Sequence, residues 1–212
     1  MSRSHNHHDN DEEDDGYEQH SAAVTGPRVG SQALSGNLES IINVKQSQVL
    51  NATHPPSLAR VLVSEGAAGT DPLSSSLLYS DASTDSPQLM VTVEFNEAVR
   101  IEALVIQAIS SGSVAAAAAP PRSVKLFVKQ PNYSFDDCET QKASFETNLT
   151  ESQLQSTPIK LPLARFASVN SITLFFPANT LDAATTFVNR IAFYGVPLAG
   201  TKMSDLRPTS CC

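Results

Sequence analysis

The chain has 212 residues, 41% of them hydrophobic, which is enough to bury the core of one sandwich- or barrel-sized domain and still leave tails. Its 14 lysines and arginines stand against 22 aspartates and glutamates, giving a net charge of -8, and six of the carboxylates lie in residues 9–15. This balance argues against a nucleic-acid-binding protein, which needs a basic surface. No apolar run approaches the ~18 residues that a membrane-spanning helix requires.

The first 36 residues have a different composition from the rest. They are rich in His, Asp, Glu, Ser and Gly with almost no large apolar side chain, so residues 1–36 are predicted to be a disordered tail. His5, His7 and His8 offer nitrogen ligands beside carboxylates, but a disordered tail fixes no coordination geometry, so we expect no defined metal site. Because the N-terminus is polar and acidic, the reverse of a secretory signal, we expect a cytoplasmic or nuclear protein.

Short elements are predicted in the region that follows. Residues 37–52 carry apolar side chains at irregular spacing, which indicates a short turn or strand rather than a long helix. Residues 57–65 are predicted to form a strand. Residues 66–87 are rich in Ser, Gly and Asp, which is typical of a long polar connection.

Strand patterns then follow one another. In residues 88–95 apolar and other side chains alternate, as in a half-buried strand, and residues 97–109 continue the pattern. Residues 110–121 form a low-complexity alanine-rich loop, because Gly112 and the two prolines at its end leave little room for a helix. Residues 122–130 alternate again.

Two further segments, 171–177 and 187–196, are rich in β-branched and aromatic residues and end near Pro177 and Pro197. In total about seven or eight segments read as strands, and no helical pattern of ten residues stands out. The predicted fold class is therefore all-β, a two-sheet sandwich of the jelly-roll type.

Two adjacent carboxylates, Asp136 and Asp137, stand beside Cys138. Paired carboxylates can hold a metal or perform acid–base chemistry, but neighbours on a strand point to opposite faces, so both serve one site only from a loop. Ser134 is placed to cap a short helical turn whose first turn would contain both carboxylates. We favour this structural interpretation.

Nucleophilic catalysis lacks its usual sequence signals. His54 is the only histidine in the predicted folded region, and no nucleophile elbow, P-loop or dinucleotide fingerprint occurs. We expect no enzymatic activity and no cofactor, with a cysteine-based enzyme around Cys138 as an alternative. The terminal Cys211 and Cys212 resemble the two-cysteine ends that are geranylgeranylated in Rab-type GTPases, although no GTPase motif accompanies them. A further alternative to a free C-terminus is a membrane-tethered adaptor in which these two cysteines are lipidated.

Three blocks of the sequence together resemble the PITH domain family, the proteasome-interacting module found at the C-terminus of a thioredoxin-like protein and as stand-alone proteins. Residues 79–106 are similar to the family's Ser-Asp segment, its two paired strands and the turn that joins them. Residues 122–139 are similar to a strand followed by Ser-Phe-Asp-Asp. Residues 163–196 are similar to Arg-Phe-x-x-Val, an Asn…Asp…Thr-Thr loop and a closing strand that ends in Tyr-Gly.

This resemblance covers residues 37–197 and leaves residues 198–212 as a flexible tail. It implies a jelly-roll sandwich similar to galactose-binding-like domains, and a non-enzymatic module that binds the regulatory particle of the proteasome. The chain departs from the family pattern in having no Trp, in its loop 54–73 and in its C-terminal end. Because no thioredoxin domain is present, the resemblance implies no disulfide reductase activity.

Seven polar residues in the resembling blocks are candidates for contact with a partner, although each has a structural alternative. Phe135 is expected to fill a pocket while the two aspartates beside it hold the turn, Arg165 is a possible buried partner of an aspartate, and the two threonines are a possible turn. The candidates are Asp81, Asp136, Asp137, Arg165, Asp182, Thr185 and Thr186.

An alternative function is a small-ligand module for a sugar or for calcium. Asp136, Asp137 and Asp182 would supply oxygen ligands to calcium. The absence of Trp removes the usual stacking residue for a sugar.

Overall fold

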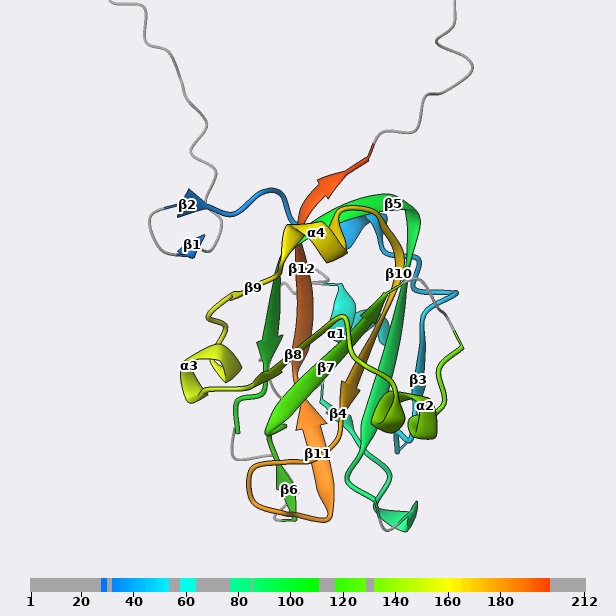
Figure 1. The fold of residues 1–212 in the computed structure, drawn as a ribbon. Helices are drawn as coiled ribbons and strands as arrows, with labels where there is room; N and C mark the ends of the chain where they lie inside the picture. Colours follow the sequence, from blue (N-terminus) through cyan, green and yellow to red (C-terminus); the bar gives the residue numbers. More distant parts are fainter. Residues whose placement is uncertain are drawn as a thin grey trace, which may run out of the picture.

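The computed structural model describes residues 28–29, 32–53, 58–63, 77–84, 86–110, 117–128 and 132–198. The fold is a β-sandwich with a few short helices at its periphery, which confirms the predicted class (Figure 1). The strands are β1 (Arg28–Val29), β2 (Gln32–Ala33), β3 (Gln48–Leu50), β4 (Leu78–Tyr79), β5 (Leu89–Gln107), β6 (Ala118–Ala119), β7 (Ser123–Val128), β8 (Phe145–Asn148), β9 (Ile159–Lys160), β10 (Val169–Phe176), β11 (Thr185–Val188) and β12 (Arg190–Pro197). The helices are η1 (Glu39–Ile41), α1 (Leu58–Leu62), η2 (Ala82–Thr84), α2 (Phe135–Thr140), α3 (Glu151–Leu154) and α4 (Leu163–Phe166).

Strand β5 is the centre of the sandwich. Its 19 residues pair with β10 and β3 through the first half, and with β12 and β9 through the second half. The main sheet therefore has the order β12-β5-β10-β7-β8, with β3 and β9 added along β5. A smaller sheet, β4-β11-β6, extends the fold at one end (Figure 1).

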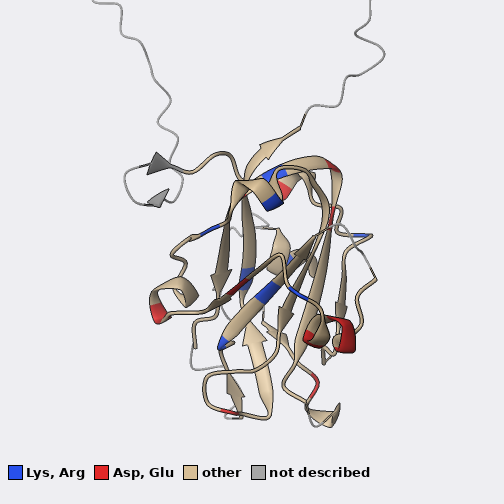
Figure 2. Ribbon diagram, viewed as in Figure 1, with Lys and Arg blue, Asp and Glu red and all other residues tan. Residues whose placement is uncertain are grey.

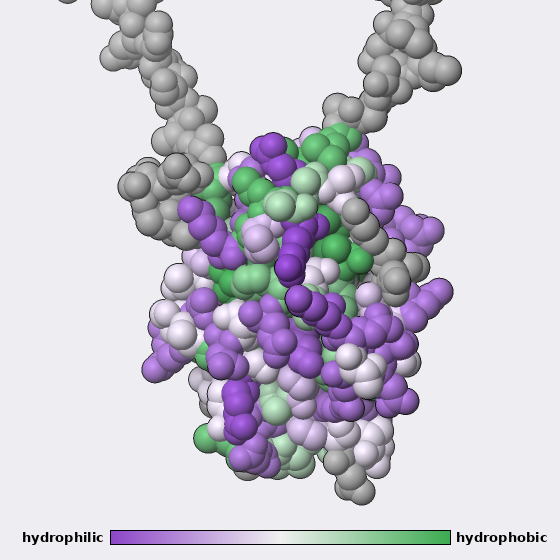
Figure 3. Space-filling model, in the orientation of Figure 1, coloured by the Kyte–Doolittle hydropathy of each residue, from purple (hydrophilic) through white to green (hydrophobic). Residues whose placement is uncertain are grey.

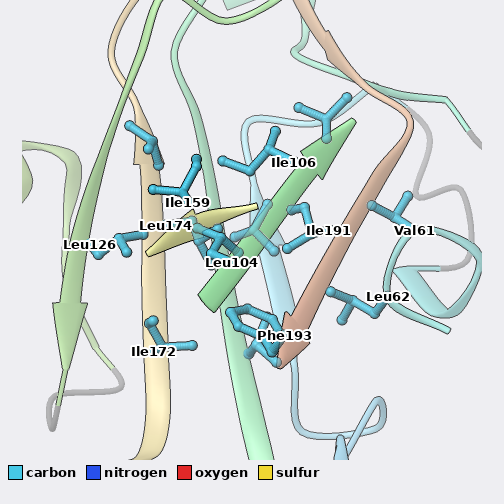
Figure 4. Packing of buried hydrophobic residues seen from close by; sticks show 14 of the residues in the cluster. Val61, Leu62, Leu104, Ile106, Leu126, Ile159, Ile172, Leu174, Ile191 and Phe193 are labelled. Atoms are coloured by element: carbon cyan, nitrogen blue, oxygen red, sulfur yellow. The ribbon is translucent and has the colours of Figure 1, made fainter. Parts of the chain in front are cut away.

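The core is built from the alternating apolar side chains of these strands. Ile172, Leu174 and Leu126 face Leu104, Ile191 and Phe193 across the interior (Figure 4). Side chains of this kind stabilise a sandwich by about 1.5–3 kcal/mol each when they are fully buried. The interior of the sandwich is thus a rigid frame for the loops at its edges.

A bulge in β5 changes which side chains face this core. The register with β12 shifts where Tyr194 pairs with Ala103 but Gly195 pairs with Ile101, which leaves Glu102 as an extra residue. A Cβ atom on Gly195 would lie 1.9 Å from the carbonyl oxygen of Arg100, so only glycine permits this close approach of the two strands.

Two of the predicted elements are wrong. Residues 57–65 were expected to form a strand, but the described part forms helix α1, with Val61 and Leu62 buried. Apolar residues at positions 58, 61 and 62 have the i, i+3, i+4 spacing of a helix, and this short pattern is also compatible with a strand. Residues 79–106 were expected to hold two paired strands and a turn, but residues 89–107 form one continuous strand that bends near the exposed Asn96 and Glu97.

Several sequence-based predictions lie outside the described residues. These are most of the tail predicted to be disordered at 1–36 (residues 1–27, 30 and 31) with its histidines, the role of His54, the fate of Cys211 and Cys212, and the centre of the alanine-rich loop at 111–116. The described end of that loop forms β6, which pairs in parallel with β11. Within the described ranges, no helix is long and apolar enough to cross a membrane.

Candidate functional site

An open hollow lies where the end of β3, the η2 loop and the start of α2 meet. Its volume is about 580 Å³, within the range of sites that take a small ligand or a few side chains. Its lining mixes aliphatic, aromatic, amide, hydroxyl and carboxylate groups. The described lining residues are Val49, Leu50, Asn51, Ala52, Asp81, Thr84, Ser86, Gln88 and Phe135.

Asn51 organises one wall of this hollow. Its φ of 59° places it in the left-handed region, which asparagine tolerates better than most residues. Its side-chain amide donates to the carbonyl oxygens of Ser86 (3.1 Å) and Gln88 (2.6 Å), and its side-chain oxygen accepts from the Thr84 hydroxyl (2.8 Å). Its backbone carbonyl accepts from the Asp81 amide at 3.0 Å. One side chain thus ties the end of β3 to the loop that precedes β5.

Helix α2 forms the opposite wall, and its N-terminus has the predicted cap. The Ser134 hydroxyl accepts from the Asp137 amide (3.1 Å), while the Asp137 carboxylate accepts from the Ser134 amide (3.0 Å) and hydroxyl (2.6 Å). These bonds, with one from Gln141, lower the pKa of Asp137 below its ordinary value because they favour the charged form. The expectation that Ser134 caps a helical turn containing both aspartates is confirmed.

The same helix covers the outer face of the main sheet. Met90, Phe127, Cys138 and Phe175 form a small buried cluster beneath it, with the Cys138 sulfur 3.6 Å from the Met90 sulfur. Phe135 packs edge-on against Phe175, with 6.0 Å between ring centroids. Phe135 therefore anchors the helix and lines the hollow at once.

Burial raises the pKa of the Cys138 thiol to about 11, and the nearby Asp137 carboxylate adds to the effect. A reactive cysteine needs the opposite, a thiolate stabilised at neutral pH and open to solvent. The surroundings of Cys138 are those of a structural residue, and they give no support to the alternative of a thiol-based active site.

The rim of the hollow is acidic. Asp81 lines it and accepts from the Ser83 amide at 2.9 Å, while Glu139 on α2 accepts from the Gln88 side chain at 2.5 Å. Asp136 is exposed on the same helix turn as Phe135. In Figure 2 much of the ribbon of α2 is red, the colour of acidic residues. Among the described lining residues none is lysine or arginine.

Two of the other candidate residues lie elsewhere. Asp182 pairs with Arg122 at 2.7 Å on the surface and does not line the hollow. In the described ranges, no three His, Cys, Asp or Glu side chains converge as a metal site would require. Arg165 is exposed on α4 and donates to the Ser144 carbonyl at 2.6 Å, so its expected role as the buried partner of an aspartate is wrong.

The two threonines have a structural role, but in a strand rather than in the expected turn. Thr185 and Thr186 belong to β11 and are buried. The Thr186 hydroxyl donates to the Pro87 carbonyl at 2.6 Å, and the Thr186 carbonyl accepts from the Ser80 amide at 2.8 Å. Thr186 therefore holds the loop that carries Asp81 through these two hydrogen bonds.

Sequence reasoning missed the residues that shape the hollow, Leu50, Asn51 and Gln88. The exposed fraction of Leu50 is 40%, although its strand β3 pairs with the core strand β5. An asparagine directly after a short strand pattern is a signal for a left-handed turn residue, and it was the one available clue.

The face drawn in Figure 3 is hydrophilic over its lower part, with hydrophobic residues near α4 at the top. Leu163 on α4 is 51% exposed. This apolar group is small and separate from the lining of the hollow.

Solved structures share this fold. The family 32 CBM from C. perfringens NanJ, solved in complex with galactose, aligns with 74% of this chain and 97% of its own length at a TM-score of 0.51 and 8% identity. A His 62 mutant of the lectin binding domain of Lectinolysin, complexed with Lewis b, aligns with 77% of this chain and 99% of its own at 0.50 and 7% identity. At such identities the likeness shows the fold alone, and it confirms the predicted galactose-binding-like jelly roll.

Sequence comparison shows the family. Thioredoxin-like protein 1 of Schizosaccharomyces pombe is 31% identical over 136 residues, which cover 63% of this chain and 44% of that protein. PITH domain-containing protein 1 of Dictyostelium discoideum is 25% identical over 114 residues, 54% of this chain and 53% of that protein. The chain thus matches about half the length of these relatives. The model of the PITH domain matches residues 29–209, and the chain belongs to the PITH domain family.

Proposed function

We propose that this protein is a non-enzymatic interaction module that binds the regulatory particle of the proteasome, and that it acts in the cytoplasm or the nucleus. Membership of the PITH family over residues 29–209 is the observation that carries the proposal. The similarity to a thioredoxin-like protein over 136 residues is consistent with this proposal. The rigid sandwich with loops at its edges suits recognition by surface complementarity.

The chemistry of the hollow supports binding rather than catalysis. Asp137 is occupied in the helix cap, Asp81 holds the η2 turn, and Cys138 is sealed beneath α2. A general acid or base needs a free lone pair or proton aimed at a reacting atom. These groups instead stabilise the local backbone, as the polar residues of a binding loop do.

A small-ligand module is the second candidate, because the hollow has the size of a sugar site and contains one aromatic ring, Phe135. A sugar needs hydrogen-bonding groups that are not already satisfied. The Asn51 amide is committed to two carbonyl oxygens, and Gln88 is bonded to Glu139. Protein binding is therefore favoured. A rise in the melting temperature of the full chain with galactose or calcium at millimolar concentration would support this second candidate.

Affinity purification of the full chain tests the proteasome proposal. The tagged protein, incubated with cell lysate at moderate salt, is expected to recover regulatory-particle subunits in near-stoichiometric amounts by quantitative mass spectrometry. Excess untagged protein should displace those subunits, because a specific site saturates. Recovery of the particle no better than with the tag alone contradicts the proposal.

A further inference from the structure

The edge of β3 that faces away from β5 borders the hollow. The backbone of Glu94 in β5 faces β3, because its amide donates to the Ser47 hydroxyl at 3.0 Å. Backbone groups of a strand alternate in direction, so the other even-numbered residues of β5 also face β3, and their partners in the register are Gln48 and Leu50. Val49 therefore directs its amide and its carbonyl away from β5.

The outward backbone groups on either side of Val49 already have partners. The Ser47 amide donates to the Asn43 carbonyl at 3.0 Å. On the other side, the Asn51 carbonyl accepts from the Asp81 amide at 3.0 Å. No group of the described residues bonds to the outward amide or carbonyl of Val49. Because Val49 lines the hollow, one backbone donor and one backbone acceptor are available there.

The chain itself pairs with this edge a few residues further along and then turns away. Ala52 forms an antiparallel bridge with Ser80, which directly follows β4. The pairing ends at Asp81, because the short helix η2 begins at the next residue. Asp81 and Thr84 both line the hollow. The hollow therefore lies where a neighbouring strand would continue beside β3, and an extended backbone suits that position.

Leu50 is the uncovered end of an apolar row on the outer face of the main sheet. The register places Leu50 beside Met90, and Met90 beside Phe175. Helix α2 covers Met90 and Phe175, with Phe135 packed against Phe175, but Leu50 remains 40% exposed. An aliphatic side chain next to Leu50 would extend this row into the hollow that Leu50 and Phe135 line. Burial of such side chains is a main favourable contribution to a protein interface.

The remaining polar groups of the lining favour an uncharged segment. Among the described lining residues Asp81 alone is ionisable, and its carboxylate already accepts from the Ser83 amide at 2.9 Å. The side-chain amides of Asn51 and Gln88 are bonded to a backbone carbonyl and to Glu139. Recognition therefore falls to the Val49 backbone and to the apolar surface.

We propose that the hollow binds an extended segment of a partner protein as an additional strand beside β3. The backbone of the segment accepts from the Val49 amide and donates to the Val49 carbonyl, and the aliphatic side chain of an adjacent residue packs against Leu50. The residue opposite Val49 points to the inner face, where Val49 packs against the core, so a small side chain fits there.

This inference rests on the proposed function, since it supplies the contact through which an interaction module of this family would hold its partner. It does not depend on that partner being the proteasome.

Four peptides titrated into isotope-labelled full-length protein test the backbone and side-chain contacts by NMR. The first is acetyl-Gln-Leu-Ala-Leu-Gln-amide. In the second, a methyl group on the alanine nitrogen removes the N–H that is expected to bond to the Val49 carbonyl. The third carries the methyl group on the nitrogen of the following leucine, whose N–H points away from β3. In the fourth, serines replace both leucines.

The first peptide is expected to shift the resonances of residues 49–52 and 135. At saturation it should slow hydrogen exchange of the Val49 amide at least ~10-fold, because that amide gains a partner. Methylation of the alanine nitrogen should weaken binding roughly 3- to 10-fold, and methylation of the leucine nitrogen less than ~2-fold. The serine peptide should bind at least ~10-fold more weakly than the first.

A pair of variants of the full chain isolates the apolar contact. Leu50→Ser removes the aliphatic surface at the end of the row and should weaken binding of the first peptide roughly 5-fold. Leu181→Ser makes the same substitution at a leucine that is 75% exposed and does not line the hollow, so its affinity should match that of the wild type.

The outcomes separate this inference from the proposed function. The inference is wrong if the first peptide shifts none of these resonances, if the two methylated peptides bind alike, or if Leu50→Ser and Leu181→Ser behave alike, even when the full chain still recovers the proteasome. If the peptides behave as expected but the proteasome is not recovered, the inference stands and the partner is a different protein.

Two further results overturn the inference in favour of another occupant. Shifts at the same residues with galactose but not with the first peptide indicate a sugar ligand. Protection of the Val49 amide that grows with protein concentration, without any peptide, indicates a second copy of this chain.

Discussion

Two loops of this protein are each held by hydrogen bonds from one asparagine side chain to the backbone, but one loop forms a closed turn and the other borders an open hollow. Asn179 is fully buried, and its side chain donates to the Ala183 and Thr185 carbonyls and accepts from the Ala183 amide, which closes the turn before β11. Asn51 also bonds to neighbouring backbone, but it leaves an open hollow beside it. An asparagine side chain that takes the place of a backbone hydrogen-bond partner can therefore stabilise either a closed turn or a loop beside an open site.

The difference lies in what surrounds each asparagine. The Asn179 turn is closed by β6 and β11, and Thr186 contributes a further contact at 3.4 Å. Asn51 follows β3, a strand of three residues that pairs with β5 alone, and its neighbour Leu50 is partly exposed. An edge strand leaves space that a central strand does not. The edge position of β3 therefore makes the hollow possible.

Replacement of Asn179 is expected to have the largest effect. Asn179→Ala leaves the buried Thr185 carbonyl and the part-buried Ala183 carbonyl and amide without this partner, so the free energy of unfolding should fall by about 3 kcal/mol. Urea unfolding measures the change. A loss below ~1 kcal/mol would contradict the role assigned to this turn.

Replacement of Asn51 should be less destabilising but should alter the hollow. Asn51→Ala removes the bonds to the Ser86 and Gln88 carbonyls and puts alanine, which tolerates a positive φ less well than asparagine, at this position, for an expected loss of about 2 kcal/mol. Asn51→Gly loses the same bonds without the strain, so it should be about 1 kcal/mol more stable than the alanine variant. Equal stabilities in urea unfolding would show that the left-handed conformation is not strained.

The cap of α2 is expected to have a smaller effect. Ser134→Ala removes the acceptor for the Asp137 amide and should lower the free energy of unfolding by about 1 kcal/mol. Thr150→Ala at the equivalent cap of α3 is the matched control, because it should cost a similar amount without changing hydrogen exchange in α2. Equal exchange in α2 for both variants would contradict the assigned cap.

The smallest expected effect is the pH dependence of Asp137. Because its pKa is lowered in the folded protein, its contribution to stability is present above the ordinary value of 3.8 and is lost as the pH falls through the folded pKa. Asp137→Asn should therefore show a weaker loss of stability below pH 4 than the wild type does. Unfolding curves at a series of acidic pH values make the comparison, with Asp182→Asn as the surface control. If stability falls with pH equally in the wild type and in Asp137→Asn, the ionisation of Asp137 does not contribute to the acid sensitivity of the fold.

The sequence predicts the sandwich well because its strands obey a simple period. Leu89, Val91 and Val93 alternate and are buried in the core, and the cap at Ser134 follows from local chemistry. The strand is not half-buried as predicted, because Met90 and Thr92 on its other face are buried too. Predictions fail where tertiary packing decides. The short pattern in α1 is compatible with either a helix or a strand, and the bulge at Gly195 depends on a contact with β5.

The hollow could not be predicted for a related reason. It depends on residues 49–52, 81, 84, 86, 88 and 135 meeting in space, and no spacing in the chain records that meeting. Of the seven candidate residues, Asp81 lines the hollow, and Asp136 follows the lining residue Phe135 in α2, while Thr186 bonds to the loop that carries Asp81. Their roles in partner binding remain predictions, as does the division of the chain at residues 37 and 197.

Site-specific photo-cross-linking tests the central claim most directly. A photo-reactive amino acid is placed at position 50 or at position 181 of the full chain, which is then illuminated in lysate. The account predicts one dominant cross-linked protein from position 50 and no equivalent product from position 181. Equal products from both positions, or none from position 50 while the chain still recovers its partner, would contradict it.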